Sequence, residues 1–138
     1  MKNVLRLTTL ALVLVMMLAC LASCFGGPNA DPEKAEEALE DNDYVVIVAD
    51  DKISLGLMGL GEDIDNLECV ITAYNEDDED DAIVIFYFED KEDADEAFKS
   101  DILKDMAEEA EEENDDVVFK KSGKMVYIGT KNAVKAAK

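Results

Sequence analysis

The stretch LECVITAYNEDDEDDAIVIFYF, residues 67–88, decides the fold of this chain. Its two ends, residues 67–74 and 82–88, are rich in β-branched and aromatic residues, which favour β-strands. Between them, residues 75–81 read NEDDEDD and contain six acids and no apolar side chain. Such a polar run between two apolar runs is typical of an exposed loop. The stretch therefore predicts a β-hairpin with an acidic loop.

Two further parts of the chain favour strands. YVVIVA at 44–49 is a β-branched run without a polar interruption. It is expected of a strand that is covered on both faces or lies centrally in a sheet. DVVFKKSGKMVYIGT at 116–130 predicts a second hairpin turning at Ser122–Gly123, because glycine readily adopts the positive φ of a tight turn. With the first hairpin, these runs give about five strands.

Helices are expected between and around these strands. Asp31 can cap a helix with Pro32 at its first position, and Asn42 can end it. One long amphipathic helix is predicted from about Lys91 to Glu112, and Thr130 can cap a last helix. The faces that we expect to be buried carry Ala35, Ala38 and Leu39 in the first helix, Ala94, Ala97, Phe98, Ile102, Leu103, Met106 and Ala110 in the second, and Ala133, Val134 and Ala137 in the last.

Residues 52–65 fit two interpretations. Ile53, Leu57 and Leu60 have helical spacing. Each of the glycines that interrupt them weakens a helix by about 1 kcal/mol relative to alanine. The segment is therefore either a short helix or an apolar loop.

These elements indicate one small α+β domain over residues 31–138. We expect an antiparallel sheet of about five strands with the helices packed on one face, and the other face either partly open or covered by the 52–65 segment. If residues 53–61 are helical, the order contains a βαββαβ core, the ferredoxin-like arrangement, with an additional strand and terminal helices.

The start of the chain carries an export signal. Lys2 and Arg6 precede an apolar run from Leu10 to Ala22 that is shorter than the ~20 residues a membrane-spanning helix needs. It ends in Leu21-Ala22-Ser23-Cys24. This ending resembles the lipobox of bacterial lipoprotein precursors at all four positions: Leu21, Ala22, Ser23 and Cys24. A cysteine placed there by chance after an ordinary secretory signal is the alternative.

The resemblance implies that the Cys24 thiol receives a diacylglycerol and that the signal is cut just before it. Cys20 is a rival, but Met17 and Leu18 fit the outer lipobox positions poorly. Residues 1–23 would then be the signal peptide, and residues 24–30 would be the lipidated cysteine and a short flexible tether. The expected location is the extracytoplasmic side of the cell membrane or outer envelope, with the membrane as a partner through the lipid anchor.

Composition excludes several classes of function. Removing residues 1–23 takes away Lys2 and Arg6 and no acid, so the formal net charge changes from −21 to −23. Such a chain repels phosphate backbones, and we expect no nucleic acid partner. The chain has no histidine, so histidine-based catalysis and the commonest metal ligand are absent. We expect no catalytic residue, no metal and no cofactor; the spacing of GLMGLG at 56–61 is wrong for a phosphate-binding loop.

Cys69 would be the only cysteine left without a modification, so no disulfide within the chain is expected. In the strand over residues 67–74 it shares a face with Leu67, Ile71 and Ala73, and free cysteine in such a place is usually a small buried hydrophobe. A catalytic thiol is the alternative.

The acidic loop at 75–81 has two interpretations. Carboxylates suit hard cations, but the loop lacks the alternating acids, central glycine and final glutamate of an EF-hand. A solvated loop that protects the hairpin from aggregation is favoured. Acids are so abundant that no pair stands out for glycoside hydrolysis.

Charge is distributed unevenly along the chain. All 34 acids lie between Asp31 and Asp116. The last 22 residues contain six lysines and no acid: Lys120, Lys121, Lys124, Lys131, Lys135 and Lys138. Such asymmetry can mark a patch for an anionic partner. The alternative is internal, because these lysines could neutralise the acidic body.

The sequence therefore favours a lipid-anchored, non-enzymatic extracytoplasmic protein that binds a ligand or partner. An envelope protein or an anionic polymer would suit the lysines. A structural or regulatory interaction module of the envelope is the second hypothesis, and an enzyme using only carboxylates, lysines or tyrosines is the third.

Overall fold

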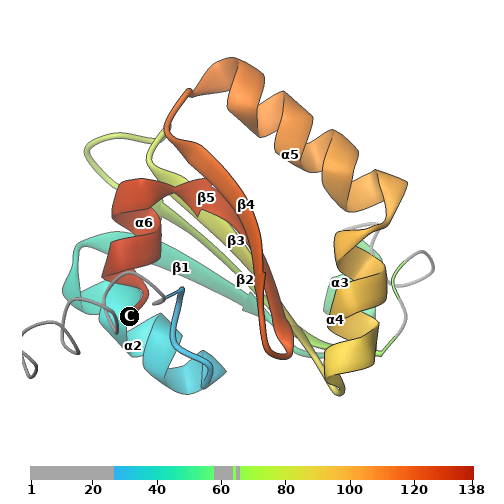
Figure 1. Ribbon diagram of the computed structural model, residues 1–138. Coiled ribbons are helices and arrows are strands. Elements are labelled where there is room, and N and C mark those ends of the chain that lie inside the picture. Colours follow the sequence, from blue (N-terminus) through green and yellow to red (C-terminus); the bar gives the residue numbers. More distant parts are fainter. Residues whose placement is uncertain (1–26, 58–63, 65) are drawn as a thin grey trace, which may run out of the picture.

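The computed structural model describes residues 27–57, 64 and 66–138, which form one α+β unit. Its strands are β1 (Tyr44–Ala49), β2 (Leu67–Asn75), β3 (Ala82–Phe88), β4 (Val117–Ser122) and β5 (Met125–Thr130). Its helices are α2 (Pro32–Asp41), α3 (Lys52–Leu57), α4 (Lys91–Phe98), α5 (Asp101–Glu113) and α6 (Lys131–Ala136). The predicted five-stranded antiparallel sheet is confirmed (Figure 1).

The strand order differs from a ferredoxin-like fold. The order is β1-β2-β3-β5-β4, with every neighbouring pair antiparallel. β3 and β4 are therefore parallel with β5 between them, so β3-α4-α5-β4 is one split βαβ unit. The first half of the chain forms no such unit, because β2 returns directly alongside β1 as its antiparallel neighbour. Residues 52–57 are helical, which agrees with the helical interpretation for this part of the 52–65 segment, whereas residues 58–63 and 65, Leu60 among them, lie outside the described residues.

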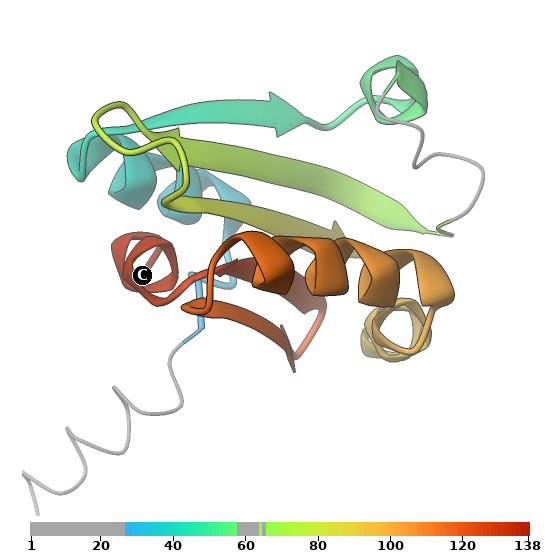
Figure 2. The ribbon, with the colours of Figure 1, turned by 90° about the horizontal axis from the view of Figure 1, so that it is seen from above.

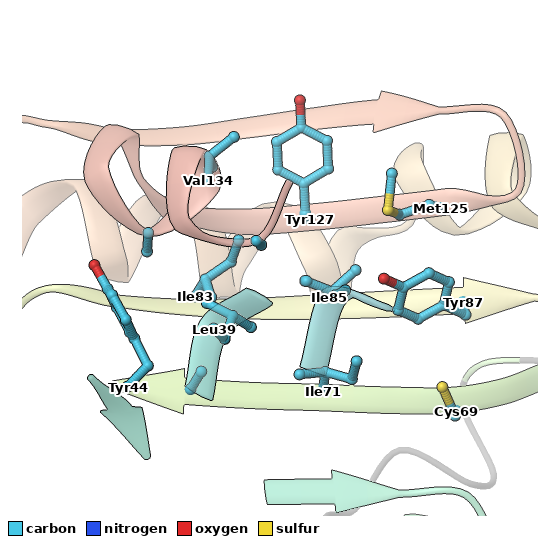
Figure 3. Close-up of a cluster of buried hydrophobic side chains, with 14 residues drawn as sticks. Leu39, Tyr44, Cys69, Ile71, Ile83, Ile85, Tyr87, Met125, Tyr127 and Val134 are labelled. Atoms are coloured by element: carbon cyan, nitrogen blue, oxygen red, sulfur yellow. The ribbon is translucent and has the colours of Figure 1, made fainter. Parts of the chain in front are cut away.

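The helices cover both faces of the sheet, so the prediction of one covered face is wrong. α2 and α6 pack on one face, where the core includes Leu39, Ile71, Ile83, Ile85 and Tyr127 (Figure 3). α3, α4 and α5 pack on the other (Figure 1), where the core includes Val70, Phe86, Phe88, Leu103 and Val126. Both faces can be buried because alternate residues of β2, β3 and β5 on each side are apolar.

β1 is an edge strand rather than a central or fully covered one. It pairs with β2 alone among the described strands, and Ile47 and Val48 are exposed. An uninterrupted apolar run cannot distinguish an edge from a central position when the neighbouring layers are unknown.

Local signals for helix ends and turns are largely confirmed. The Asp31 carboxylate accepts a hydrogen bond from the Glu33 N–H and caps α2, with Pro32 in its first turn. Asn42 ends α2, and Thr130 Oγ1 accepts from the Ala133 N–H to cap α6. The hairpin turns at Gly123–Lys124, one residue later than the predicted Ser122–Gly123, and Gly123 has φ 59°, as the first central position of such a turn requires.

The predicted long helix over residues 91–112 is two helices. α4 ends at Phe98, and α5 begins at Asp101 after Ser100 adopts an extended conformation. Ser100 Oγ donates to the Ala97 carbonyl at 2.6 Å and accepts from the Leu103 N–H at 3.4 Å. Its hydroxyl therefore helps to terminate one helix and start the next, as serine does at an N-cap.

Candidate functional site: a basic groove beside the first described residues

The lipobox residues Leu21, Ala22, Ser23 and Cys24 lie outside the described residues. The description begins at Gly27, three residues after Cys24. Among residues 27–57, 64 and 66–138, no helix is both long enough and apolar enough to cross a membrane.

Residues 27–29, expected to belong to a flexible tether, are packed against the domain. Pro28 is buried, and the Asn29 N–H donates to the Ala137 carbonyl at 2.8 Å. The buried Tyr87 hydroxyl donates to the Asn29 carbonyl at 2.8 Å. A Cβ at Gly27 would lie 2.9 Å from the Tyr127 ring, so the backbone there passes directly over that ring. The prediction of a flexible tether is therefore wrong for residues 27–29.

A groove of about 480 Å³ lies on the α2/α6 face of the sheet, between α6 and the edge strand β4. Gly27 contributes to its wall. Val118, Tyr127 and Val134 supply apolar surface, and the Lys120 position lies directly across from Tyr127 in the β4–β5 pairing. Five of the six predicted lysines line the groove: Lys120, Lys121, Lys131, Lys135 and Lys138. Lys124 lies in the hairpin turn and does not line it.

Two of these lysines also meet acids. The Lys121 ammonium pairs with the Asp95 carboxylate of α4, on the other face of the sheet, and lies 5.9 Å from the centre of the Phe98 ring. This ion pair lowers the pKa of Asp95, since the hydrogen bond from Lys121 favours the carboxylate. Lys131 lies 3.8 Å from Asp116, with both side chains largely exposed.

Three of the other lysines are not used for internal charge balance in the same way. All six are exposed, and in the part of the chain that the structure describes, Lys120, Lys124 and Lys135 form no ion pair. Internal neutralisation accounts for Lys121 and in part for Lys131. It leaves cationic side chains on the rim of a groove whose lining residues include no Asp or Glu.

Sequence reasoning missed the residues that shape the groove. Val118 and Tyr127 could have been assigned to one face by strand alternation, and Val134 by helical spacing. Gly27 carries no such signal, because it is brought to Tyr127 across a separation of about one hundred residues only by the fold. The burial of the Tyr127 phenol raises its pKa, so the aromatic ring is a neutral wall of the groove.

One residue of the acidic loop, Asp81, has a structural role. Asp81 accepts a hydrogen bond from the Tyr44 hydroxyl at 2.7 Å and another from the Thr130 hydroxyl. Thr130 in turn caps α6, so one carboxylate connects β1, β3, β5 and the start of α6. Burial, followed by the bond to Asp81, raises the Tyr44 pKa. Within the described residues, no group of three or more carboxylate or cysteine side chains could hold a metal ion.

Cys69 is buried on the α2/α6 face with Ile71 and Ala73, as predicted, but Leu67 is not on that face. A bulge between Leu67 and Cys69 places Leu67 opposite Phe88 and Cys69 opposite Tyr87. The additional residue turns Leu67 to the other face of the sheet. Burial raises the Cys69 pKa to about 11, so the thiol is protonated and poorly suited to nucleophilic attack.

No family model, curated protein or solved structure significantly matches this chain.

Proposed function

We propose that this protein is a lipid-anchored extracytoplasmic binding module that holds an anionic ligand in the basic groove. The anchor in this proposal is a diacylglycerol on Cys24, with Leu21, Ala22 and Ser23 as the recognition sequence. The motif supports the anchor, and the single observation that carries the binding role is the groove itself. Four separate segments, namely Gly27, β4, β5 and the C-terminal helical region, contribute to one cavity rimmed by lysines.

The ligand is expected to be an anion with several charged groups. The lysines are distributed around the groove rather than converging on one point, and they come from both β4 and α6. Lysine is a point charge on a flexible stem, which suits repeated phosphate or carboxylate groups better than one planar group. An envelope polymer or an acidic protein segment has this chemistry.

An enzymatic role has less support from the described residues. Cys69 is buried and protonated. Asp51 and Asp95 have lowered pKa values, through hydrogen bonds from Ser54 and Lys121 respectively. A carboxyl that acts as a general acid needs the opposite shift.

A protein-interaction module is the second candidate, favoured by a different surface. Ile53 and Leu57 of α3 are 77% and 85% exposed, and Ile47 and Val48 of edge strand β1 are also exposed. Ile53 and Leu57 are four residues apart and so lie on one side of α3, and exposed apolar side chains on one surface favour a protein partner. Capture of the lipidated protein from its native envelope distinguishes the candidates, because a protein partner lost on changing Ile53 and Leu57 to Ser would favour this surface.

The anionic-ligand proposal is tested with soluble polyphosphate as the probe. The triple variant Lys120→Gln, Lys131→Gln and Lys135→Gln removes three charges from the groove. The matched control changes Lys52, Lys91 and Lys104 to Gln. These exposed lysines lie on α3, α4 and α5, away from the groove, and their replacement makes the net charge more negative by the same amount.

We expect polyphosphate binding at low salt to fall at least about tenfold in the groove variant and to change little in the control. Equal binding by the groove variant and the unaltered protein would contradict the proposal.

A further inference from the structure

The basic groove lies at the point where the chain leaves toward its lipid anchor. Gly27 lines the groove and is three residues from Cys24. Three residues span at most about 11 Å when fully extended. This proximity rests on the proposed lipidation of Cys24, because that modification would bring the Gly27 end of the groove within this distance of a bilayer surface.

The connection from Gly27 to the domain leaves little freedom for the groove to turn away. Asn29 is bonded to Ala137 and Tyr87, and Gly27 lies on the Tyr127 ring. Figure 2 shows the segment that begins at Gly27, in blue, beside α6 and the β4–β5 edge. A lipid on Cys24 would therefore place the side of the domain that carries the groove nearest to the membrane.

The charges of the domain are arranged to suit this orientation. Lys120, Lys131 and Lys135 are exposed on the groove side. The acidic helices α4 and α5 cover the opposite face of the sheet. On the groove face, α2 packs over β1 and β2, and α6 packs over β3 and β5, so α6 separates the acids of α2 from the groove.

We propose that the groove docks on the anionic lipid headgroups of the membrane that holds the anchor. When the groove rests on the bilayer, its lysines lie within the Debye length of about 8 Å at physiological salt, where the surface potential is still felt. The acidic side then faces the aqueous compartment. Because two acyl chains already give stable attachment, the lysines would set the orientation of the domain rather than retain it at the membrane.

The experiment uses residues 25–138, which contain every described element, without the lipid. Binding is measured by co-flotation with vesicles of phosphatidylglycerol and, separately, of neutral phosphatidylcholine, at low salt. The groove triple variant and the matched control variant defined above are measured beside the unaltered protein. Thermal melting of each variant establishes that it is folded.

The unaltered protein should bind phosphatidylglycerol vesicles and not phosphatidylcholine vesicles. The groove variant should lose at least about tenfold in binding, because each lysine near an anionic surface strengthens binding about fivefold. The control variant should lose less than about twofold. Equal losses in the two variants would overturn the proposal, since total charge alone would then explain the binding.

The polyphosphate measurement separates this proposal from the function on which it rests. Polyphosphate binding through the groove without binding to phosphatidylglycerol vesicles would overturn membrane docking and leave a soluble anion as the ligand. Absence of both would overturn the anionic-ligand function together with the docking.

Discussion

Asp81 connects several elements of this fold through the hydrogen bonds of one carboxylate. It is one of six acids in the loop at 75–81, and its neighbours in that loop are exposed. Its partners Tyr44 and Thr130 are 37 and 49 residues away, so no local pattern distinguishes it from the other acids of the loop. The loop was correctly predicted as a connection between strands. The structural role of Asp81 follows from the strand order, because that order brings Tyr44 and Thr130 to the loop.

Replacement of Asp81 should therefore lower the free energy of unfolding, even though the chain has a large excess of acids. Asp81→Ala leaves the hydroxyls of Tyr44 and Thr130 without their acceptor, and a lost acceptor at a partly buried site costs about 1–3 kcal/mol. Asp80→Ala makes the same chemical change at an exposed neighbour and should alter the free energy of unfolding by less than about 0.5 kcal/mol. Urea unfolding of both variants checks this. Similar values for the two would show that the Asp81 hydrogen bonds contribute no stability.

At the scale of the element, the sequence predicted well which segments form strands and helices. It predicted less well where each element lies in the sheet and where it ends. The caps of α2 and α6 and the turn at Gly123 follow from local chemistry and are confirmed. The edge position of β1 and the bulge after Leu67 depend on pairing with other strands. The break at Ser100 is made locally by the hydrogen bonds of the Ser100 hydroxyl. Amphipathic spacing continues across residues 98–101, so it could not reveal that the helix ends there.

The close approach of β3 and β5 leads to a prediction about two glycines. A Cβ at Gly129 would lie 2.7 Å from Ile83 Cβ and 2.9 Å from the Ala82 carbonyl oxygen, whereas a Cβ at Gly56 would meet nothing within 4 Å. Gly129→Ala should destabilise the fold by about 1–3 kcal/mol through overpacking. Gly56→Ala in α3 should be neutral or stabilise by up to about 1 kcal/mol. Thermal melting compares them, and a Gly129→Ala variant as stable as Gly56→Ala would contradict this packing.

At the scale of the whole molecule, the sequence revealed the separation of charge but not its geometry. The last 22 residues carry all the lysines of the predicted patch. The structure divides those lysines between an ion pair with α4, an exposed pair with Asp116 and the rim of a groove. Strand alternation alone sends Lys121 and Lys120 to opposite faces. Their different surroundings became clear only when α4 and α6 were placed on those faces.

The buried tyrosines and Cys69 predict that the fold is sensitive to alkali. Burial raises the Cys69 pKa from its ordinary 9.0 to about 11. Burial also raises the pKa values of Tyr44, Tyr87 and Tyr127. The unfolded chain therefore releases these protons first, so their contribution to stability is complete below about pH 9 and is lost as the pH rises through about 11.

The midpoint of urea unfolding should thus fall between pH 9 and 11 and should fall less in the Cys69→Ala variant, which lacks the thiol. A midpoint that does not change with pH over this range would contradict the burial of these groups.

The central claim is that this domain is held at a membrane by lipid on Cys24, and mass spectrometry of the N-terminal peptide from membrane-extracted protein tests it most directly. The account predicts a peptide that begins at Cys24 and carries a diacylglycerol on its sulfur. The Cys24→Ala variant should be neither cut nor lipidated, whereas Cys20→Ala should give the same lipidated peptide as the unaltered protein. A mature protein that begins at another residue, or a Cys24 with a free thiol, would contradict the anchor and remove the reason for placing the groove at the membrane.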